Sequence, residues 1–323
     1  MSNSPFLSNC TVDAIRDAAA AIKAGHLVAF PTETVYGLGA DARNPIAVNR
    51  IYEVKGRPSD HPLIVHISSI NQLEKWASEI PDYAIALGRN FWPGPMTLIL
   101  KRTDLAGDFI TGGQDTVGLR VPSDPIALAL IQEFEKISNS AIAAPSANRF
   151  GQVSPTSSSD VNEELGEYLA DLDVILDGGN CLIGIESTII DCSGSNPVIL
   201  RSGFITKEDI EDVLGEVRIQ NSIPNGMKFS GVFEKHYAPK AQVILDVNPE
   251  EGDGFIGLKS IPTQDNVIRL ASPEGVNDFA RILYSALRNA DQLGINRIVI
   301  AQPQGNGLAA AIRDRLAKSA SGR

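Results

Sequence analysis

Three segments of the sequence place polar or charged side chains directly beside apolar runs of strand length. Residues 31–38 read Pro-Thr-Glu-Thr-Val-Tyr-Gly-Leu after such a run, Arg120 stands among apolar neighbours in 117–121, and Ser146 and Asn148 follow the run 141–144. α/β proteins bind ligands in loops at strand ends, and an arginine among apolar residues needs an anionic partner. The pattern predicts a polar cavity formed by several strand ends. A hairpin connection, a structural salt bridge and a turn are the respective alternatives.

The candidate cations are few and come from separate parts of the chain. Lys55 and Arg57 stand at the end of a predicted helix, Arg120 lies on a predicted strand, and Arg201 closes another. Many hydroxyl side chains accompany them, but no Ser/His/Asp series or carboxylate pair stands out. This inventory suits binding and aligning a polyanion, with positioning and charge neutralisation supplying most of the catalysis. For Lys55 alone, the helix macrodipole is a sufficient explanation.

Alternating apolar runs and helical patterns in the first 215 residues predict a mixed α/β architecture that positions these side chains. Strands are expected over residues 27–30, 63–67, 96–100, 117–121, 141–144, 174–176, 188–191 and 198–200. A helix is expected over 45–55, because Asn44 can cap it, Pro45 suits its first position and Gly56 can end it. Similar signals predict helices over 81–91, 125–134, 159–169 and 206–214.

A second α/β unit is expected near the end of the chain. Residues 216–240 break into Asn, Ser, Pro and Gly, which predicts a linker. In the remainder, apolar residues at three- and four-residue spacing predict a helix over 276–293, followed by a strand over 298–300 and a helix over 308–316. We therefore expect an α/β domain (1–215), a linker (216–240) and a small second α/β domain (241–323).

The charge balance argues against a protein built to hold nucleic acid. The chain carries 28 Lys and Arg against 39 Asp and Glu, and residues 1–215 carry 15 against 28. Proteins that hold nucleic acid through phosphate contacts are normally basic. Residues 150–200 contain no Lys or Arg, and their acids, such as Glu163, Glu164 and Glu167, are expected on an outer helical face. An anionic substrate would therefore be held by the few cations named above.

Several other classes are excluded by pattern. No apolar run approaches the roughly 18 residues that cross a membrane, and the start of the chain lacks the pattern of a secretory signal. Cys10, Cys181 and Cys192 show no CxxC spacing and indicate reduced thiols in the cytoplasm. The four histidines lack metal-ligand spacing, so no protein-held metal is expected. Residues 252–257 match GxGxxG, but their context predicts an ordinary loop.

Motifs over about residues 12–215 resemble the YrdC-like domain of threonylcarbamoyl-AMP synthases. They are residues 31–38, Lys-Gly-Arg-Pro at 55–58, 62–66, Trp-Pro-Gly-Pro-Met-Thr at 92–97, 118–122, Pro-Ser-Ala-Asn at 145–148 and Ile-Glu-Ser-Thr at 185–188. His-Tyr-Ala-Pro-Lys at 236–240 resembles the linker of the two-domain form, and residues 307–316 resemble its C-terminal domain more loosely. The implied fold is a YrdC-like twisted mixed sheet with flanking helices, plus a small Rossmann-like α/β domain.

The resemblance implies an enzyme that joins L-threonine, bicarbonate and ATP into threonylcarbamoyl-AMP and pyrophosphate, with Mg²⁺. The product would serve a separate tRNA threonylcarbamoyl-transferase complex, without stable nucleic-acid binding or membrane attachment. By the same resemblance, L-threonine would be held by Thr34, His66, Arg120, Ala144 and Ser187, with Arg120 pairing with its carboxylate. ATP would be held by Arg57, His61, Thr116, Ser146, Asn148, Ser154, Arg201 and Tyr237. Lys55 and Arg57 would be catalytic, with Lys55 neutralising phosphate.

Two rival functions are also compatible with the sequence. The first is an RNA-binding or ribosome-associated module, which the acidic charge disfavours. The second is an ATP-dependent carbamoyl-transfer protein with another acceptor, since hydrogenase-maturation proteins contain a similar domain. This chain shows no zinc-finger or acylphosphatase-like segment of the kind that accompanies it there, which favours the synthase.

Overall fold

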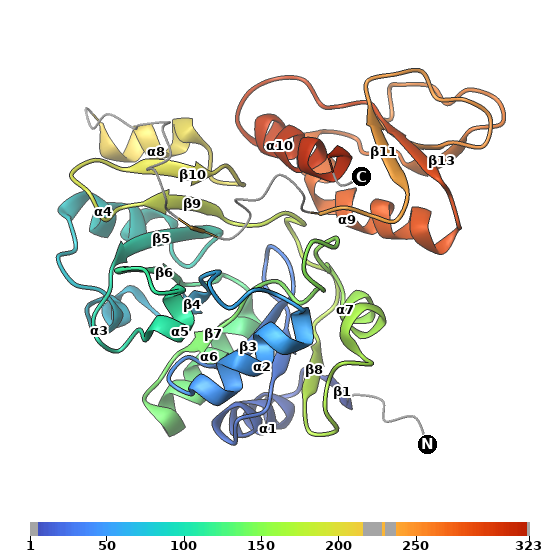
Figure 1. The fold of residues 1–323 in the computed structure, drawn as a ribbon. Helices are drawn as coiled ribbons and strands as arrows, with labels where there is room; N and C mark the ends of the chain where they lie inside the picture. Colours follow the sequence, from blue (N-terminus) through green and yellow to red (C-terminus); the bar gives the residue numbers. More distant parts are fainter. Residues whose placement is uncertain (1–5, 216–227, 230–236, 322–323) are drawn as a thin grey trace.

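The computed structural model describes residues 6–215, 228–229 and 237–321, which form two units with separate sheets (Figure 1). The larger unit holds a mixed sheet with flanking helices, and the smaller unit, in orange and red, holds a parallel sheet. Most of the predicted linker, including His236, lies outside the described residues. Within the described part, no helix is long and apolar enough to cross a membrane.

The larger sheet brings together strands that are far apart in the sequence. In the described part of the chain its order is β1-β8-β2-β3-β7-β4-β6-β5-β9-β10. The strands are β1 Phe6–Asn9, β2 Val28–Phe30, β3 Gly37–Asp41, β4 Ile64–His66, β5 Met96–Lys101, β6 Thr116–Arg120, β7 Ile142–Ala143, β8 Val174–Asp177, β9 Thr188–Asp191 and β10 Val198–Arg201. Parallel and antiparallel pairs occur in the same sheet, as in β4 with β6 and β5 with β6. The predicted mixed α/β fold is confirmed.

Helices cover both faces of this sheet, and β2 shows how. Val28 and Phe30 join one apolar cluster with α1 and α6, whereas the neighbouring Leu27 and Ala29 join another with α2, α3, α4 and α7. Successive residues of a strand point to opposite faces, so both faces of β2 are buried. The helices are α1 Val12–Lys23, α2 Pro45–Lys55, η1 Ile70–Gln72, α3 Leu73–Trp76, α4 Asp82–Phe91, α5 Asp108–Thr111, α6 Pro125–Ser138, α7 Ser158–Leu165 and α8 Lys207–Leu214.

The smaller unit is a parallel sheet with two long helices. Its strands are β11 Gln242–Leu245, β12 Gly254–Ile256, β13 Ile268–Ala271 and β14 Arg297–Ile300, and their described order is β11-β14-β12-β13. Its helices are α9 Val276–Gln292 and α10 Leu308–Ala320. One apolar cluster contains Phe279 and Leu287 from α9, Ile298 from β14 and Ile312 from α10. The predicted second α/β unit is therefore confirmed.

Two local predictions need correction. Residues 252–257 do not form an ordinary loop, because Gly254–Ile256 is the buried strand β12. No helix follows β12 before β13 in the described chain, so a dinucleotide-binding turn is absent there, as predicted. The helix expected over 159–169 is α7, which ends at Leu165.

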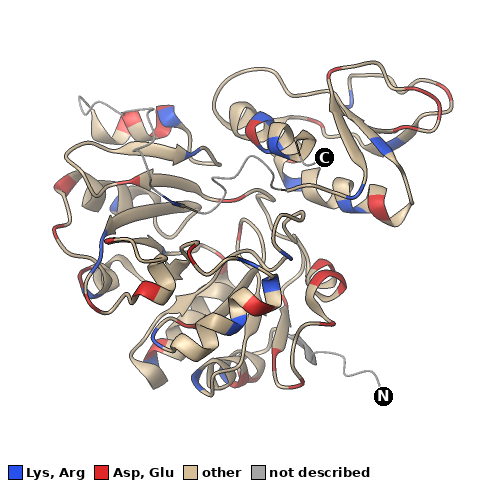
Figure 2. Cartoon of the chain, viewed as in Figure 1, with Lys and Arg blue, Asp and Glu red and all other residues tan. Residues whose placement is uncertain are grey.

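The acidic side of α7 was expected to face outward, and it partly faces the second unit instead. Glu163 is exposed but accepts a hydrogen bond from Gln292 of α9 at 2.9 Å, and Glu164 pairs with Arg288 at 3.2 Å. Figure 2 shows acidic residues on α7 and basic and acidic residues interspersed over both units. Two of the acids of residues 150–200, Glu163 and Glu164, thus contact the second unit.

Candidate active site

The segment 31–36 forms the connection between β2 and β3 and also a wall of the site. β2 and β3 pair antiparallel, with Phe30 opposite Gly37. The hydroxyl of Thr32 donates to the Val35 carbonyl at 2.7 Å and lies 2.9 Å from the hydroxyl of Thr34. These bonds hold the loop in one shape, as Thr side chains commonly do in turns. The hairpin interpretation is therefore confirmed, and the role of this segment as a ligand loop stays a prediction.

Strand pairing places His66 and Arg120 beside each other. β4 and β6 are parallel, and His66 is the register partner of Arg120. On the other side of β4, the Ala144 N–H donates to the Ile64 carbonyl at 2.9 Å. Residues from three strands that are distant in sequence thus share one region of the sheet.

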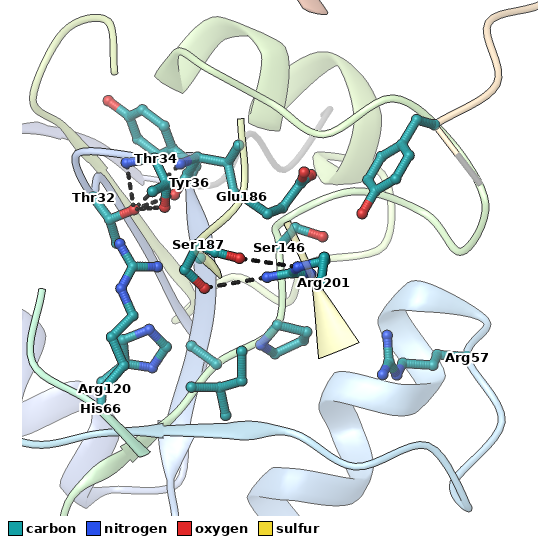
Figure 3. A pocket seen from close by; sticks show the side chains of 16 residues that line it. Thr32, Thr34, Tyr36, Arg57, His66, Arg120, Ser146, Glu186, Ser187 and Arg201 are labelled. Carbon is teal, nitrogen blue, oxygen red and sulfur yellow. Dashed lines mark hydrogen bonds between the residues drawn. The ribbon is translucent and has the colours of Figure 1, made fainter. Parts of the chain in front are cut away.

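These side chains line one cavity (Figure 3). All five residues predicted for threonine lie in its wall: Thr34, His66, Arg120, Ala144 and Ser187. Four of the residues predicted for ATP join them: Arg57, Ser146, Arg201 and Tyr237. Figure 3 shows Ser187 and Arg201 facing each other, and the Arg201 guanidinium donates to the Ser187 carbonyl at 3.0 Å and to its hydroxyl at 3.2 Å.

Lys55 and Asn148 lie behind this cavity and do not line it. The Lys55 ammonium donates to the Ser146 carbonyl at 2.6 Å and to the Asn148 carbonyl, and the Phe150 N–H donates back to the Lys55 carbonyl at 2.8 Å. The left-handed cap at Gly56 ends α2 there. Lys55 therefore holds the loop that carries Ser146, and its role in neutralising phosphate stays a prediction.

Three further predicted ATP ligands lie outside the cavity wall. Ser154 is buried and donates to the Glu186 carboxylate at 2.7 Å, and the His61 ring packs against Phe150 with centroids 5.3 Å apart. Thr116 lines a second cavity. Ile64 lines both cavities, so they adjoin along β4.

Lys228 and Phe229, which belong to the predicted linker, contact the larger unit beside this second cavity. Both residues line it, and Phe229 packs in an apolar cluster with Ile99, Ile189 and Leu200 of the sheet. The Lys228 ammonium pairs with Asp60 at 2.6 Å. These two linker residues therefore cover part of the second cavity.

Burial sets the charge state of the cationic side chains. The pKa of Arg57 is lowered to about 10 by desolvation, and in the described chain no carboxylate lies within ion-pair distance of it. Desolvation also lowers the pKa of Arg201. Arginines in this state remain charged at neutral pH but gain strongly from an anionic ligand. The cavity is therefore prepared for a polyanion.

His66 is neutral in this site. Desolvation and the neighbouring Arg120 lower its pKa from 6.5 to about 3. A neutral imidazole can donate one hydrogen bond and accept another. His66 can thus orient a substrate without adding charge.

Two carboxylates at the site were not predicted from sequence. Glu33 pairs with Arg120 at 2.8 Å, so the salt-bridge alternative for Arg120 is also correct. Glu186 lines the cavity and pairs with Arg315 of the smaller unit at 2.9 Å. Both stand inside motifs used above, beside Thr34 and Ser187, and that adjacency was the signal that could have found them.

Comparison with known proteins identifies the family. Residues 20–203 match the Sua5/YciO/YrdC family, described as telomere recombination, and residues 205–321 match the C-terminal domain of threonylcarbamoyl-AMP synthase. The chain belongs to the Sua5/YciO/YrdC family. It is 44% identical to a threonylcarbamoyl-AMP synthase of Pyrococcus abyssi, over 94% of this chain and 93% of that protein, and 40% identical to one of Bacillus subtilis, over 96% and 93%.

The fold agrees with a solved member of the family. A crystal structure of P. abyssi Sua5 complexed with L-threonine matches with a TM-score of 0.88 at 41% identity, covering 98% of each chain. The Sua5-type arrangement of a mixed-sheet unit and a parallel-sheet unit is thus shared over nearly the whole length.

Proposed function

We propose that this chain is a threonylcarbamoyl-AMP synthase, which converts L-threonine, bicarbonate and ATP into threonylcarbamoyl-AMP and pyrophosphate. The observation that carries the proposal is one cavity that contains every residue predicted for threonine together with Arg57 and Arg201. Full-length relatives named threonylcarbamoyl-AMP synthase support the same activity. We regard it as a nucleotidyl-transferring enzyme.

The threonine end of the cavity would lie around Arg120. Its guanidinium already pairs with Glu33, but an arginine has five N–H donors, and among the described residues its buried Nε has no hydrogen-bond partner. The threonine carboxylate can therefore pair with Arg120 while Glu33 keeps the guanidinium in place. Thr34, His66 and Ser187 supply nearby hydrogen-bonding groups.

The phosphate end would lie between Arg57 and Arg201. Ser146 and Tyr237 line the same region, and Lys55 supports it by holding the Ser146–Asn148 backbone. Thr116 in the adjoining cavity would contact the nucleotide farther from the phosphates. His61, Asn148 and Ser154 would act beside these contacts rather than in the cavity wall.

The chemistry joins two anions, so charge neutralisation is the main requirement. The threonine amine forms an N–C bond with bicarbonate, and water is lost to leave a carbamate. A carbamate oxygen then bonds to the α-phosphorus while the bond to the bridging oxygen breaks and pyrophosphate leaves. Arg57 and Arg201 would neutralise charge on both partners. A closed site would also protect the mixed anhydride from water.

Magnesium would enter this site as part of the ATP substrate. Among the described residues, no group of three or more His, Cys, Asp or Glu side chains could hold a metal. The two carboxylates near the cavity are paired, Glu33 with Arg120 and Glu186 with Arg315. Magnesium bound to ATP shields phosphate charge.

The remaining assignments concern partners and place in the cell. We propose that threonylcarbamoyl-AMP is released to a separate tRNA threonylcarbamoyl-transferase complex, without stable nucleic-acid binding by this chain. The cysteines Cys10, Cys181 and Cys192 are free, which supports a cytoplasmic location. We also propose residues 1–215 as the catalytic domain, 216–240 as its cover and 241–323 as a supporting domain.

Pyrophosphate release tests this function directly. The full-length chain is incubated with ATP and Mg²⁺ and with each amino acid in turn, with and without bicarbonate. We expect release that needs both threonine and bicarbonate, and mass spectrometry should detect threonylcarbamoyl-AMP. Release that ignores threonine would overturn the proposal.

A further inference from the structure

The Glu186 carboxylate connects the cavity with the smaller unit. It is buried and accepts hydrogen bonds from the Ser154 hydroxyl at 2.7 Å, the Tyr284 hydroxyl at 2.9 Å and the Arg315 Nε at 2.9 Å. Tyr284 belongs to α9 and Arg315 to α10, so two of these three donors come from the second unit. Glu186 is therefore the point where helices of that unit reach the cavity.

Residues next to Glu186 carry this connection into the site. Ser187 follows it in sequence and accepts two hydrogen bonds from Arg201, a predicted ATP ligand. The Glu186 and Arg201 charges also interact, because each shifts the pKa of the other group. The position of the Glu186 carboxylate thus affects the guanidinium that we assign to the phosphates.

Tyr237 is held by the same residues of the second unit. Its ring stacks on Tyr284 with centroids 5.6 Å apart, and the Arg315 guanidinium lies 5.5 Å from its ring centroid. The Ser319 hydroxyl, one turn beyond Arg315 on α10, donates to the Tyr237 carbonyl at 2.8 Å. Two residues that line the cavity, Glu186 and Tyr237, therefore depend on Tyr284 and Arg315.

Apolar side chains also pack across the contact between the two units. Val35, Ile185 and Tyr237 belong to the apolar core cluster of the second unit, together with Phe279 and Tyr284. A fully buried ion pair such as Glu186–Arg315 is a poor way to gain stability, because desolvation offsets the attraction. Its geometric effect is clearer: it ties the Glu186 carboxylate of the larger unit to Arg315 of the second unit.

We propose that Arg315 and Tyr284 of the second unit are positioning residues for the adenylation site. They hold the Glu186 carboxylate on Arg315 and hold Tyr237 at the cavity, so that Glu186 does not compete with the triphosphate for Arg201. The inference rests on the proposed function. It assigns the second unit a direct part in ATP binding.

The charge arrangement makes a specific prediction for Arg315→Met. Without the Arg315 charge, the Glu186 carboxylate would pair with Arg201 and compete with the phosphates. We expect the KM for ATP to rise by on the order of 10- to 100-fold, with a smaller change in the KM for threonine. Glu186→Gln removes the competing charge, so the double variant Arg315→Met/Glu186→Gln should recover much of the ATP affinity lost in Arg315→Met.

The experiment measures ATP binding by calorimetry and pyrophosphate release for both variants and their combination in the full-length chain. Gln292→Ala is the control, because it removes an exposed contact between the units, to Glu163, away from the cavity. Tyr284→Phe removes only one hydroxyl and serves if Arg315→Met does not fold. For that variant we expect weaker ATP binding with an intact thermal transition.

The outcomes separate this inference from the proposed function. An unchanged ATP affinity in Arg315→Met and Tyr284→Phe would overturn the positioning role, as would a double variant no better than Arg315→Met. Failure of the unmodified chain to release pyrophosphate with threonine would instead reject the proposed function. In that case the calorimetric comparison still tests whether the second unit controls ATP binding.

Discussion

At the scale of single residues, the Arg120–Glu33 pair explains how a buried arginine can keep its charge when no carboxylate ligand is bound. The pair is almost fully buried, and Glu33 keeps the guanidinium charge compensated before substrate arrives. The sequence predicted that Arg120 needs an anionic partner, but it could not distinguish a protein carboxylate from a ligand. The structure shows the protein carboxylate: Glu33 contacts the Nη2 atom, and the other N–H donors of Arg120 are the ones that we propose for threonine.

Substitution of Arg120 should therefore weaken the binding of threonine and leave the binding of ATP unchanged. In Arg120→Met/Glu33→Gln both charges are removed together, so no buried carboxylate is left unpaired. We expect the KM for threonine to rise by on the order of 100-fold, as for loss of one buried charge partner, with little change in the KM for ATP. Steady-state pyrophosphate release against each substrate provides the measurement. An unchanged threonine requirement in this variant would contradict the assigned role.

His66 should make the protein sensitive to mild acid. Its pKa is lowered from 6.5 to about 3 in the folded state, so folding favours the neutral ring. That contribution is complete above pH 6.5 and is lost as the pH falls toward 3. Between pH 7 and pH 5 the loss amounts to roughly 2 kcal/mol. Urea unfolding at both pH values should show that the free energy of unfolding falls less from pH 7 to pH 5 in His66→Gln than in the native chain. Equal falls in the two proteins would refute the assignment.

At the scale of elements, sequence signals were sufficient where one local interaction defines an end. α2 begins after the Asn44 cap and ends at Gly56 with φ 61°, as predicted, because caps and left-handed glycines act within a few residues. β3 was missed because Gly37-Leu38-Gly39 lacks the branched residues typical of strands. Its glycines serve close packing: a Cβ at Gly39 would lie 2.7 Å from Ile142 Cγ2.

Gly184 likewise allows close packing, in this case between the two units. Its φ is +81°, and a Cβ there would lie 2.5 Å from the Arg281 carbonyl oxygen of α9. Gly184→Ala should therefore displace α9, weaken the Tyr284 and Arg315 contacts to Glu186 and raise the KM for ATP.

Gly179→Ala is the matched control for Gly184→Ala. Gly179 has a φ of +78° but no atom within 4 Å of its would-be Cβ, so it carries the same backbone cost, about 1 kcal/mol, without the collision. Both variants are compared by urea unfolding and by ATP titration. The argument fails if the two alanine variants have equal stability and equal KM for ATP.

At the scale of the whole molecule, the sequence predicted the two units but not the side-chain contacts between them. Tyr284 and Arg315 lie 98 and 129 positions after Glu186 in the sequence, and no sequence periodicity relates the three residues. Pairs at such distances arise only from the packing of complete units, whereas Lys55, Arg57, Arg120 and Arg201 could be named as a group from their chemistry alone. The structure shows three of these four in the cavity wall and the fourth behind it.

The distribution of charge over the molecule also predicts its affinity for tRNA. Residues 1–215 carry 15 Lys and Arg against 28 Asp and Glu. Four cations of this unit, Lys55, Arg57, Arg120 and Arg201, are buried, and so are four acids, Glu33, Asp173, Glu186 and Asp191, so its outer surface keeps the full excess of acidic charge. Phosphate backbones are repelled by such a surface.

We therefore expect tRNA binding weaker than about 10⁻⁴ M at physiological salt, outside the range of ordinary non-specific binders. Electrophoretic mobility shift with the full-length chain and unmodified tRNA measures this, with a basic RNA-binding protein as the positive control. Retardation at micromolar protein that disappears steeply with added salt would show a phosphate-binding surface and would contradict the expectation.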